Sequence, residues 1–176
     1  MSGKPRSGQR SGCPVSVALE TLGDRWSLLI IRDLMVRGLK TFKDFSEAGE
    51  RIATNILANR LERLEARGII EVEPDPRDRR KVNYRLTQKG IELAPVLLEL
   101  LIWGARHHPT AAPCQMIENM ARNRKQVLGE VERRWRKRDR NPFFRPFPNP
   151  STAPTDQGEP RGGRRALTKP RESHSA

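Results

Sequence analysis

A helix followed at once by a short hairpin constrains the fold of this chain more than any other feature of its sequence. Leu57, Leu61 and Leu64 recur at i, i+4 and i+7, which predicts a helix over residues 54–67 with one narrow apolar face. Gly68 follows, a residue type that commonly ends helices. The next segments, IIEVE and KVNYRL, alternate apolar and polar side chains, and this pattern predicts two strands paired as a hairpin.

The link between the two strands, PDPRDRR, is too long for a two-residue turn. It carries Arg77, Arg79 and Arg80, and Lys81 follows at its base. The sequence therefore predicts a projecting cationic loop, called the wing below, over residues 74–81.

The residues before the leucine-rich helix predict three shorter helices. The first spans residues 14–22, with proline at its start, and the second spans residues 25–37 with Asp24 as its N-cap. Thr41 and Asp44 have the spacing of a capping box and predict a third, short helix. The side chains expected on the apolar faces of these helices are Val15, Ala18, Leu19, Leu22, Trp26, Leu28, Leu29, Ile31, Met35, Phe42 and Phe45.

Two helical segments are predicted after the hairpin. Thr87 caps a long helix over residues 88–107, in which Pro95 causes a kink. Residues 113–138 place apolar side chains near heptad spacing, and this segment ends in the basic cluster RRWRKRDR. Three interpretations stay open for it: a helix packed on its own domain, a longer dimer seam, and a basic surface lying along flanking DNA or an anionic membrane.

Three helices followed by a basic hairpin is the element order of a winged helix-turn-helix. We therefore expect a mainly α fold with a small β-hairpin. The outer face of the 54–67 helix carries Asn55, Asn59 and Arg63. Asparagine makes bidentate contacts to adenine in the major groove, and arginine contacts guanine or phosphate. The competing interpretation is an ordinary solvated helix face, with the wing as a solubilising turn.

The charge of the chain narrows the class of partner. The formal net charge is +13 and the pI is about 10.9, which favours a polyanionic partner, either nucleic acid or an anionic membrane surface. The surplus lies mainly in residues 1–12, expected to form a flexible basic arm, and in residues 109–176. Within the latter, residues 109–140 are expected to form a basic helical extension, and residues 141–176 a disordered tail rich in Pro, Gly and Arg. With neither a membrane span nor a signal-peptide pattern in view, we expect a cytoplasmic protein.

Three separated segments resemble one known family. CPVSVALETLGDRWSLLIIRDLMVRGLKTFKDF, RIATNILANRLERLEARGIIEVEPDPRDRRKVNYRLTQKG and LAPVLLELLIWG are similar, in order and spacing, to the HxlR-type winged helix regulators of bacteria across residues 13–108. The resemblance implies a MarR-like fold and a homodimeric transcription factor on a pseudo-palindromic operator, with the first helix and the helix after the wing packing against the partner subunit.

Carried over residue by residue, the resemblance places Thr54, Asn55, Asn59 and neighbouring polar positions on the recognition helix. It places the wing cations Arg77, Arg79, Arg80 and Lys81 on the flanking backbone or in the minor groove. The C-terminal extension departs from the short members of the family, and the resemblance assigns it no role. The operator sequence, the direction of regulation and the effector are not set by these patterns.

The two cysteines, Cys13 and Cys114, are expected to be reduced thiols. Cys13 precedes Pro14 at a helix start, where the helix dipole favours the thiolate, and some members of the resembled family sense oxidants with a cysteine at this position. The alternative is a Cys13 that only packs at the dimer boundary. Cys114 lies near His107 and His108, but their loose spacing is a weak metal signal, and we expect neither a metal nor another cofactor.

Two further classes of function compete with the DNA-binding regulator. One is a basic RNA-associated protein. Against it, this sequence lacks the exposed aromatic platform that is typical of proteins that bind single-stranded RNA. The other is a thiol-dependent enzyme built on Cys13, for which no histidine or acid stands at an obvious pairing position. We therefore expect a non-enzymatic regulator.

Overall fold

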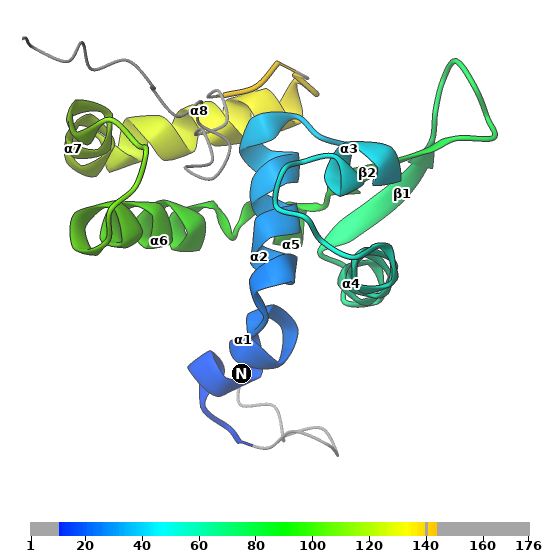
Figure 1. The fold of residues 1–176 in the computed structure, drawn as a ribbon, viewed down its shortest axis with the longest axis horizontal. Helices are drawn as coiled ribbons and strands as arrows, with labels where there is room; N and C mark the ends of the chain where they lie inside the picture. The colour runs from blue at the N-terminus through cyan, green and yellow to red at the C-terminus, as the bar shows by residue number, and fades with distance from the viewer. Residues whose placement is uncertain (1–10, 140, 144–176) are drawn as a thin grey trace, which may run out of the picture.

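The computed structural model describes residues 11–139 and 141–143 (Figure 1). The predictions of a flexible basic arm and a disordered tail fall almost entirely on residues 1–10 and 144–176, outside the described residues. In chain order the elements are α1 (Pro14–Leu22), α2 (Arg25–Arg32), the π-helix η1 (Asp33–Arg37), α3 (Phe42–Ser46), α4 (Thr54–Ala66), β1 (Ile70–Pro74), β2 (Val82–Leu86), α5 (Gln88–Ile91), α6 (Ala94–His107), α7 (Cys114–Arg122) and α8 (Arg124–Arg136).

The predicted caps of the N-terminal helices are present. The Asp24 carboxylate accepts hydrogen bonds from two backbone N–H groups in the first turn of α2. Thr41 and Asp44 form a reciprocal capping box at the start of α3. The predicted 25–37 helix differs in its second half, where the last five residues are π-helical, and Gly38 ends it with a φ of 71°.

Helix α2 crosses the middle of the molecule and has neighbours on several sides (Figure 1). Its buried residues, Ser27, Ile30 and Ile31, lie at i, i+3 and i+4. Leu28 and Leu29, predicted as core, flank this stripe and are only half-buried. The prediction was wrong there because the apolar run LLII does not itself show which of its sides faces the core.

Helix α4 and the hairpin follow the predicted pattern. Leu57, Leu61 and Leu64 are the buried residues of α4. Gly68 adopts a φ of 67°, a left-handed conformation that favours glycine. The strands pair antiparallel, with Ile70 opposite Leu86. The mostly helical chain with one two-stranded sheet thus has the predicted winged helix-turn-helix fold.

The segment after the hairpin corrects one prediction. Instead of one kinked helix over residues 88–107, the chain forms α5 and α6 with a break at Glu92 and Leu93. Pro95 explains the break, because its ring nitrogen cannot donate to the carbonyl of Ile91, four residues back. Gly90 packs so closely on the hairpin that an added Cβ would overlap the Ile69 carbonyl oxygen.

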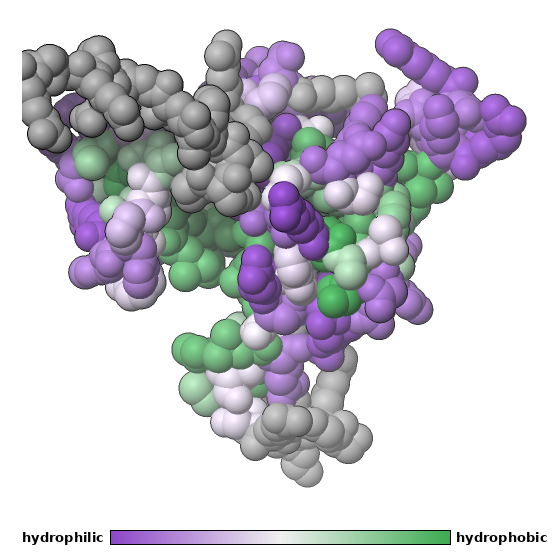
Figure 2. All heavy atoms as spheres, viewed as in Figure 1, coloured by the Kyte–Doolittle hydropathy of each residue, from purple (hydrophilic) through white to green (hydrophobic). Residues whose placement is uncertain are grey.

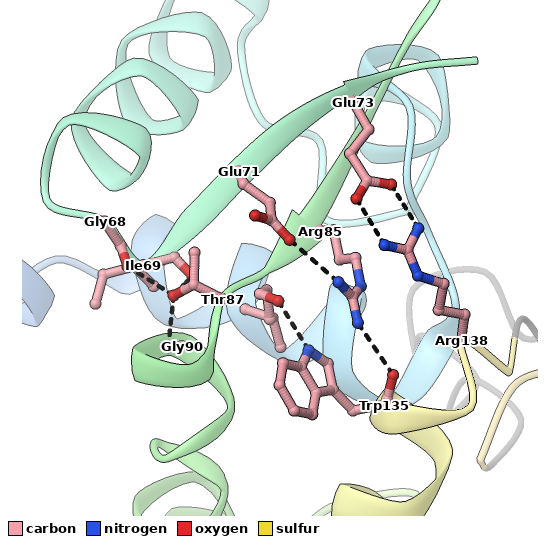
Figure 3. A network of polar contacts seen from close by, with 10 residues as sticks. Gly68, Ile69, Glu71, Glu73, Arg85, Thr87, Gly90, Trp135 and Arg138 are labelled. Atoms are coloured by element: carbon pink, nitrogen blue, oxygen red, sulfur yellow. Dashed lines mark hydrogen bonds and ion pairs between the residues drawn. The ribbon is translucent and has the colours of Figure 1, made fainter. Parts of the chain in front are cut away.

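The C-terminal extension packs on the winged helix domain. The predicted 113–138 helix is divided at Asn123 into α7 and α8, and Val131 of α8 joins the same buried cluster as the leucines of α4. The Trp135 indole N–H donates to the Leu86 carbonyl at 2.8 Å, and Arg138 pairs with Glu73 at 2.9 Å (Figure 3). Of the open interpretations of this segment, packing on its own domain is the one that describes α8.

Candidate nucleic-acid interface

The buried stripe of α4 determines which of its residues face outward. Leu57 is 0% exposed, and both Leu61 and Leu64 are nearly as well covered. Because these leucines occupy one side of the helix, Asn55 lies exposed on the opposite side. Thr54 lies one turn before Leu57 and is exposed as the first residue of the helix. Within the described residues, neither Thr54 nor Asn55 has a side-chain hydrogen-bond partner. Their polar groups are therefore available to an external ligand.

The other two predicted residues of this helix make contacts within the protein. The Asn59 Oδ1 accepts a hydrogen bond from the Arg60 guanidinium at 2.6 Å. Arg63 extends towards α1, where its Nη2 donates to the Glu20 carbonyl at 3.4 Å. The two side chains remain exposed. Two of the four predicted residues, at the N-terminus of the helix, therefore have no hydrogen-bond partner among the described residues, and the two further along the helix contact other residues of the protein.

Arg60, which was not among the predicted site residues, connects α4 to the start of α2. Its Nε donates to Asp24 Oδ1 at 2.9 Å, and the same carboxylate accepts from the Ser27 hydroxyl at 2.7 Å. Partial burial acts to raise the pKa of Asp24, but the hydrogen bonds from Ser27 and Arg60 outweigh it and lower the pKa. The cap of one helix thus also fixes the position of the next. The position of Arg60 beside the leucine stripe was the only sequence signal for it.

A second polar cluster holds the turn between α3 and α4. Buried Asp33 accepts from Arg32 at 2.8 Å and from Arg37 at 3.1 Å. Arg32 also reaches Glu50 at 3.0 Å, and Arg37 donates to the Ala48 carbonyl at 3.3 Å. Burial raises the pKa of Asp33, although the two arginines oppose that shift. The cluster joins η1 to the turn that precedes α4.

The wing has an ordered backbone. Asp75 Oδ2 accepts from the Asn83 amide at 3.0 Å, and its Oδ1 accepts from the Arg77 backbone N–H at 2.8 Å. These two hydrogen bonds hold the pKa of Asp75 at about 2, below its ordinary value of 3.8. The Asp75 N–H also donates to the Lys81 carbonyl across the base of the loop at 2.8 Å.

The cations of the wing differ in their surroundings. Arg80 and Lys81 pair with Asp78, at 3.0 Å and 3.8 Å. Within the described residues, the Arg77 and Arg79 side chains contact no carboxylate, and both are exposed. Figure 2 shows a hydrophilic projection at the wing. Two of the four predicted wing cations are thus unpaired.

Apolar side chains are also exposed on the molecule, over α1 and α6 (Figure 2). Helix α1 has no buried residue: Val15 is 66% exposed and Leu19 is 57% exposed. On α6, Val96, Leu100 and Trp103 are exposed, Trp103 to 57%. The apolar faces of α1 and α6 are therefore partly open to solvent in the single chain.

The two cysteines are free and exposed. Cys13 is the N-cap of α1, and the backbone N–H groups of Ser16 and Val15 lower the pKa of its thiol. Cys114 is the first residue of α7. In the described part of the chain, no three His, Cys, Asp or Glu side chains gather as a metal site. Nor is any helix there long and apolar enough to cross a membrane.

Comparison with known proteins identifies the family. The family model described as HxlR-like helix-turn-helix matches residues 21–112. The chain belongs to the HxlR-like helix-turn-helix family. The match covers α2 to α6 and ends before α7, so α7, which packs on α6, and α8, which contacts the hairpin, lie outside it.

Two relatives from Bacillus subtilis are both described as helix-turn-helix transcriptional regulators. The transcriptional regulator YodB of Bacillus subtilis is 41% identical over 92 residues, which are 52% of this chain and 81% of YodB. The uncharacterized transcriptional regulator YdeP of the same organism is 33% identical over 96 residues, 54% of this chain and 74% of YdeP.

Among solved structures, the oxidized form of the redox regulator HypR matches with a TM-score of 0.50 and 32% identity. The match covers 55% of this chain and 99% of HypR. These relatives are described as transcriptional regulators, and the chain is similar to them over about half of its length.

Proposed function

We propose that this chain is a homodimeric, sequence-specific DNA-binding transcriptional regulator. The observation that carries the proposal is a pair of uncommitted polar surfaces on two elements, α4 and the wing, that both lie at the right of Figure 1. One is the start of α4, with Thr54 and Asn55, and the other is the wing tip, with Arg77 and Arg79. A fixed helix with free amide groups beside a cationic loop suits a major groove and the neighbouring phosphates.

In this proposal the start of α4 enters the major groove. The Asn55 amide makes bidentate contacts to an adenine, and Thr54 contacts a base edge or phosphate beside it. Asn59 and Arg63 lie further along the helix and take part at the edge of the contact. Arg77 and Arg79 follow the backbone or the adjacent minor groove, with Arg80 and Lys81 adding charge at the base of the wing.

The exposed apolar surfaces of α1 and α6 support a homodimer. Val15, Leu19, Leu100 and Trp103 are apolar side chains that stay about half or more exposed in the single chain, and extended exposed apolar surface marks protein–protein contacts. A two-fold dimer formed through them presents two copies of α4, which calls for a pseudo-palindromic operator with half-sites about 34–36 Å apart.

Cys13 offers a way in which oxidation affects this dimer. Its thiol is exposed, has a lowered pKa and lies at the start of α1, beside the apolar surface assigned to the dimer. The likeness to HypR, a redox regulator, supports the same role. Oxidation of Cys13 therefore alters DNA binding, whereas a Cys13→Ser protein binds DNA equally with and without a thiol oxidant.

Selection of binding sites from a random duplex pool tests the proposed function. We expect a symmetric site, bound as a dimer in sedimentation and outcompeting both random duplex and RNA. For about six to ten phosphate contacts, affinity falls by roughly 10³ to 10⁵ between 50 and 200 mM salt. Inserting about half a helical turn between the half-sites weakens binding to the level of one half-site. A monomer that binds RNA or random duplex equally well contradicts the proposal.

A further inference from the structure

Helix α8 connects α6 to the hairpin (Figure 1). Near its start, Val127 and Leu128 pack on a buried cluster that contains Leu98 and Ile102 of α6. Further along, Val131 belongs to the larger buried cluster that also holds the leucines of α4 and residues of both strands. Because α8 begins after residue 112, the family match does not include this connection.

Trp135 and Arg85 join α8 to β2 (Figure 3). The Trp135 indole N–H donates to the Leu86 carbonyl at 2.8 Å. The Arg85 guanidinium donates to the Trp135 carbonyl at 3.4 Å, and its Cζ lies 5.1 Å from the centre of the Trp135 ring. The same guanidinium donates to Glu71 of β1 at 3.2 Å. One backbone group and one side chain of β2 thus hold the same tryptophan.

Arg138 joins the end of α8 to β1. It makes a two-point ion pair with Glu73, at 2.9 and 3.0 Å. Glu73 precedes Pro74, the last residue of β1, where the wing begins. Arg138 has a φ of 54°, a left-handed conformation that is unfavourable for residues other than glycine and persists only where neighbouring contacts fix it. The end of β1 next to the wing is therefore held by a defined contact from α8.

The base of the hairpin is buried more deeply than its wing end. Ile70 and Leu86, which pair at the base, are 1% and 2% exposed, whereas Val82, in the last pair before the wing, is 42% exposed. Burial therefore holds the base more firmly, and the direction of the wing depends on contacts made near its end. Arg138 supplies such a contact on β1, and the Lys40 carbonyl accepts from a backbone N–H of β2 at 2.7 Å.

The same contacts neutralise two acidic side chains beside the wing. Glu71 and Glu73 of β1 each pair with an arginine, Glu71 with Arg85 and Glu73 with Arg138. An unpaired carboxylate at this place would repel the phosphates that the proposed function assigns to the wing. Arg138 thus affects the wing in two ways, because it holds β1 and cancels the charge of Glu73.

We propose that α8 directs the wing onto DNA, with Trp135 and Arg138 as positioning residues. They hold the hairpin at the angle at which Arg77 and Arg79 contact phosphates while α4 lies in the major groove. This inference rests on the proposed function, and it gives a role to a helix outside the family match. Exposed ion pairs add little to the free energy of folding, so the Arg138 pair acts mainly on the contact with DNA.

Charge reversal at Arg138 tests this role on DNA. Arg138→Glu sets two carboxylates against each other at the end of β1. Lys137→Glu makes the same change of charge at an exposed neighbour that has no ion pair among the described residues. We expect Arg138→Glu to weaken binding to every duplex at least about threefold more than Lys137→Glu does, with the base preference unchanged. Equal losses in the two variants overturn the proposal.

Two double variants show whether the loss arises from the ion pair and passes through the wing. Glu73→Arg combined with Arg138→Glu restores an ion pair at the net charge of wild type, and should recover the affinity to within about twofold. In the Arg138→Glu background, Arg79→Ala should cost at least about twofold less than in wild type, because a misdirected wing makes less use of Arg79. Failure to recover, or purely additive losses, contradicts the proposal.

Trp135→Phe tests the other positioning residue without a change of charge. It keeps an aromatic ring against the buried cluster but removes the indole donor to the Leu86 carbonyl. We expect affinity for every duplex to fall at least about twofold, with thermal unfolding confirming that the variant folds. Wild-type affinity in a folded Trp135→Phe protein contradicts the role of this residue.

A distance measurement without DNA separates this inference from the proposed function. Spin labels are attached at Glu62→Cys, an exposed position of α4, and at Arg79→Cys on the wing, in a full chain whose two native cysteines are replaced by serine. Labelled chains are diluted with unlabelled ones, so that pulsed electron paramagnetic resonance records the distance between the labels of one chain.

We expect the distance distribution to shift or broaden in Arg138→Glu and in Trp135→Phe, and to stay as in wild type in Lys137→Glu. An unchanged distribution in both Arg138→Glu and Trp135→Phe overturns the role of α8. If the distribution changes as expected but the wild-type chain selects no duplex sequence, the proposed function fails, and the result still supports α8 as the helix that holds the wing.

Discussion

Helix α4 and the wing both lie at the right of Figure 1, but the protein holds them in different ways. Helix α4 is seated by its buried leucines and joined to α2 through Arg60 and Asp24. The wing has an ordered backbone, set by Asp75, yet the side chains at its tip extend without partners. This difference assigns the selection of sequence to the helix and the gain of affinity to the wing, because base readout needs fixed geometry and phosphate attraction does not.

The largest expected effect is on base readout by α4. Asn55→Ala should cost about 1–3 kcal/mol on the selected site and relax the preference at one base position. Measurement of affinity for the selected site and for its single-base variants checks this. Gln126→Ala, an exposed amide on α8, is the matched control and should change nothing. An equal loss on every duplex would show that α4 is not the reader.

The next largest effect is expected at the contact between α2 and α4, which Arg60 and Asp24 form. Asp24→Ala removes an N-cap and the Arg60 contact together, and should lower the free energy of unfolding by about 0.5–2 kcal/mol. Arg60→Met keeps the cap and removes the contact between α2 and α4, together with the hydrogen bond from Arg60 to Asn59. We expect Arg60→Met to unfold close to wild type yet bind the selected site more weakly. Chemical denaturation and DNA titration separate the two, and unchanged DNA binding by Arg60→Met would mean that the contact does not position the helix.

A smaller and uniform effect is expected at the wing. Arg79→Ala should weaken binding to all duplexes by a similar factor and reduce the slope of log affinity against log salt by about 0.9, the value of one phosphate contact. The control is Arg122→Ala, an exposed arginine of α7. A loss confined to the selected site would give the wing a reading role and remove the contrast with α4.

The smallest effect concerns protonation at the base of the wing. The folded protein depresses the pKa of Asp75 to about 2 through hydrogen bonds from Asn83 and the Arg77 N–H. Its contribution to stability is therefore present above pH 3.8 and is lost as the pH falls through about 2. An NMR titration of the Asp75 carboxyl carbon, with the Asn83 amide protons as a second signal, measures this. A midpoint near 4 would mean that the loop is not held as described.

The sequence predicted those parts of the fold that depend on short-range patterns. The leucine stripe of α4, the capping box of Thr41 and Asp44, and the Gly68 stop are local features, and the structure contains all three. The identity of the fold followed from their order. The wing cations were also visible, because the charges of a loop need no partner to be recognised.

Features that depend on long-range contacts were not predictable. The neighbours of Arg60 and Arg63 come from α1 and α2, dozens of residues away in the sequence. Which side of α2 is buried depends on elements that pack around it in three dimensions. The hydrogen bond from the Trp135 indole to the Leu86 carbonyl is the clearest case, since these two residues meet only when α8 folds back.

The indole of Trp135 on the Leu86 carbonyl has a practical consequence for anyone dissecting this protein. Truncation at residue 112, where the family match ends, would remove α7 and α8 and expose apolar surface on both the hairpin and α6. Such a fragment should aggregate during purification, and its loss of DNA binding would not test the role of α4 or the wing. Limited proteolysis should likewise leave residues 124–138 attached, marking the smallest piece worth crystallising.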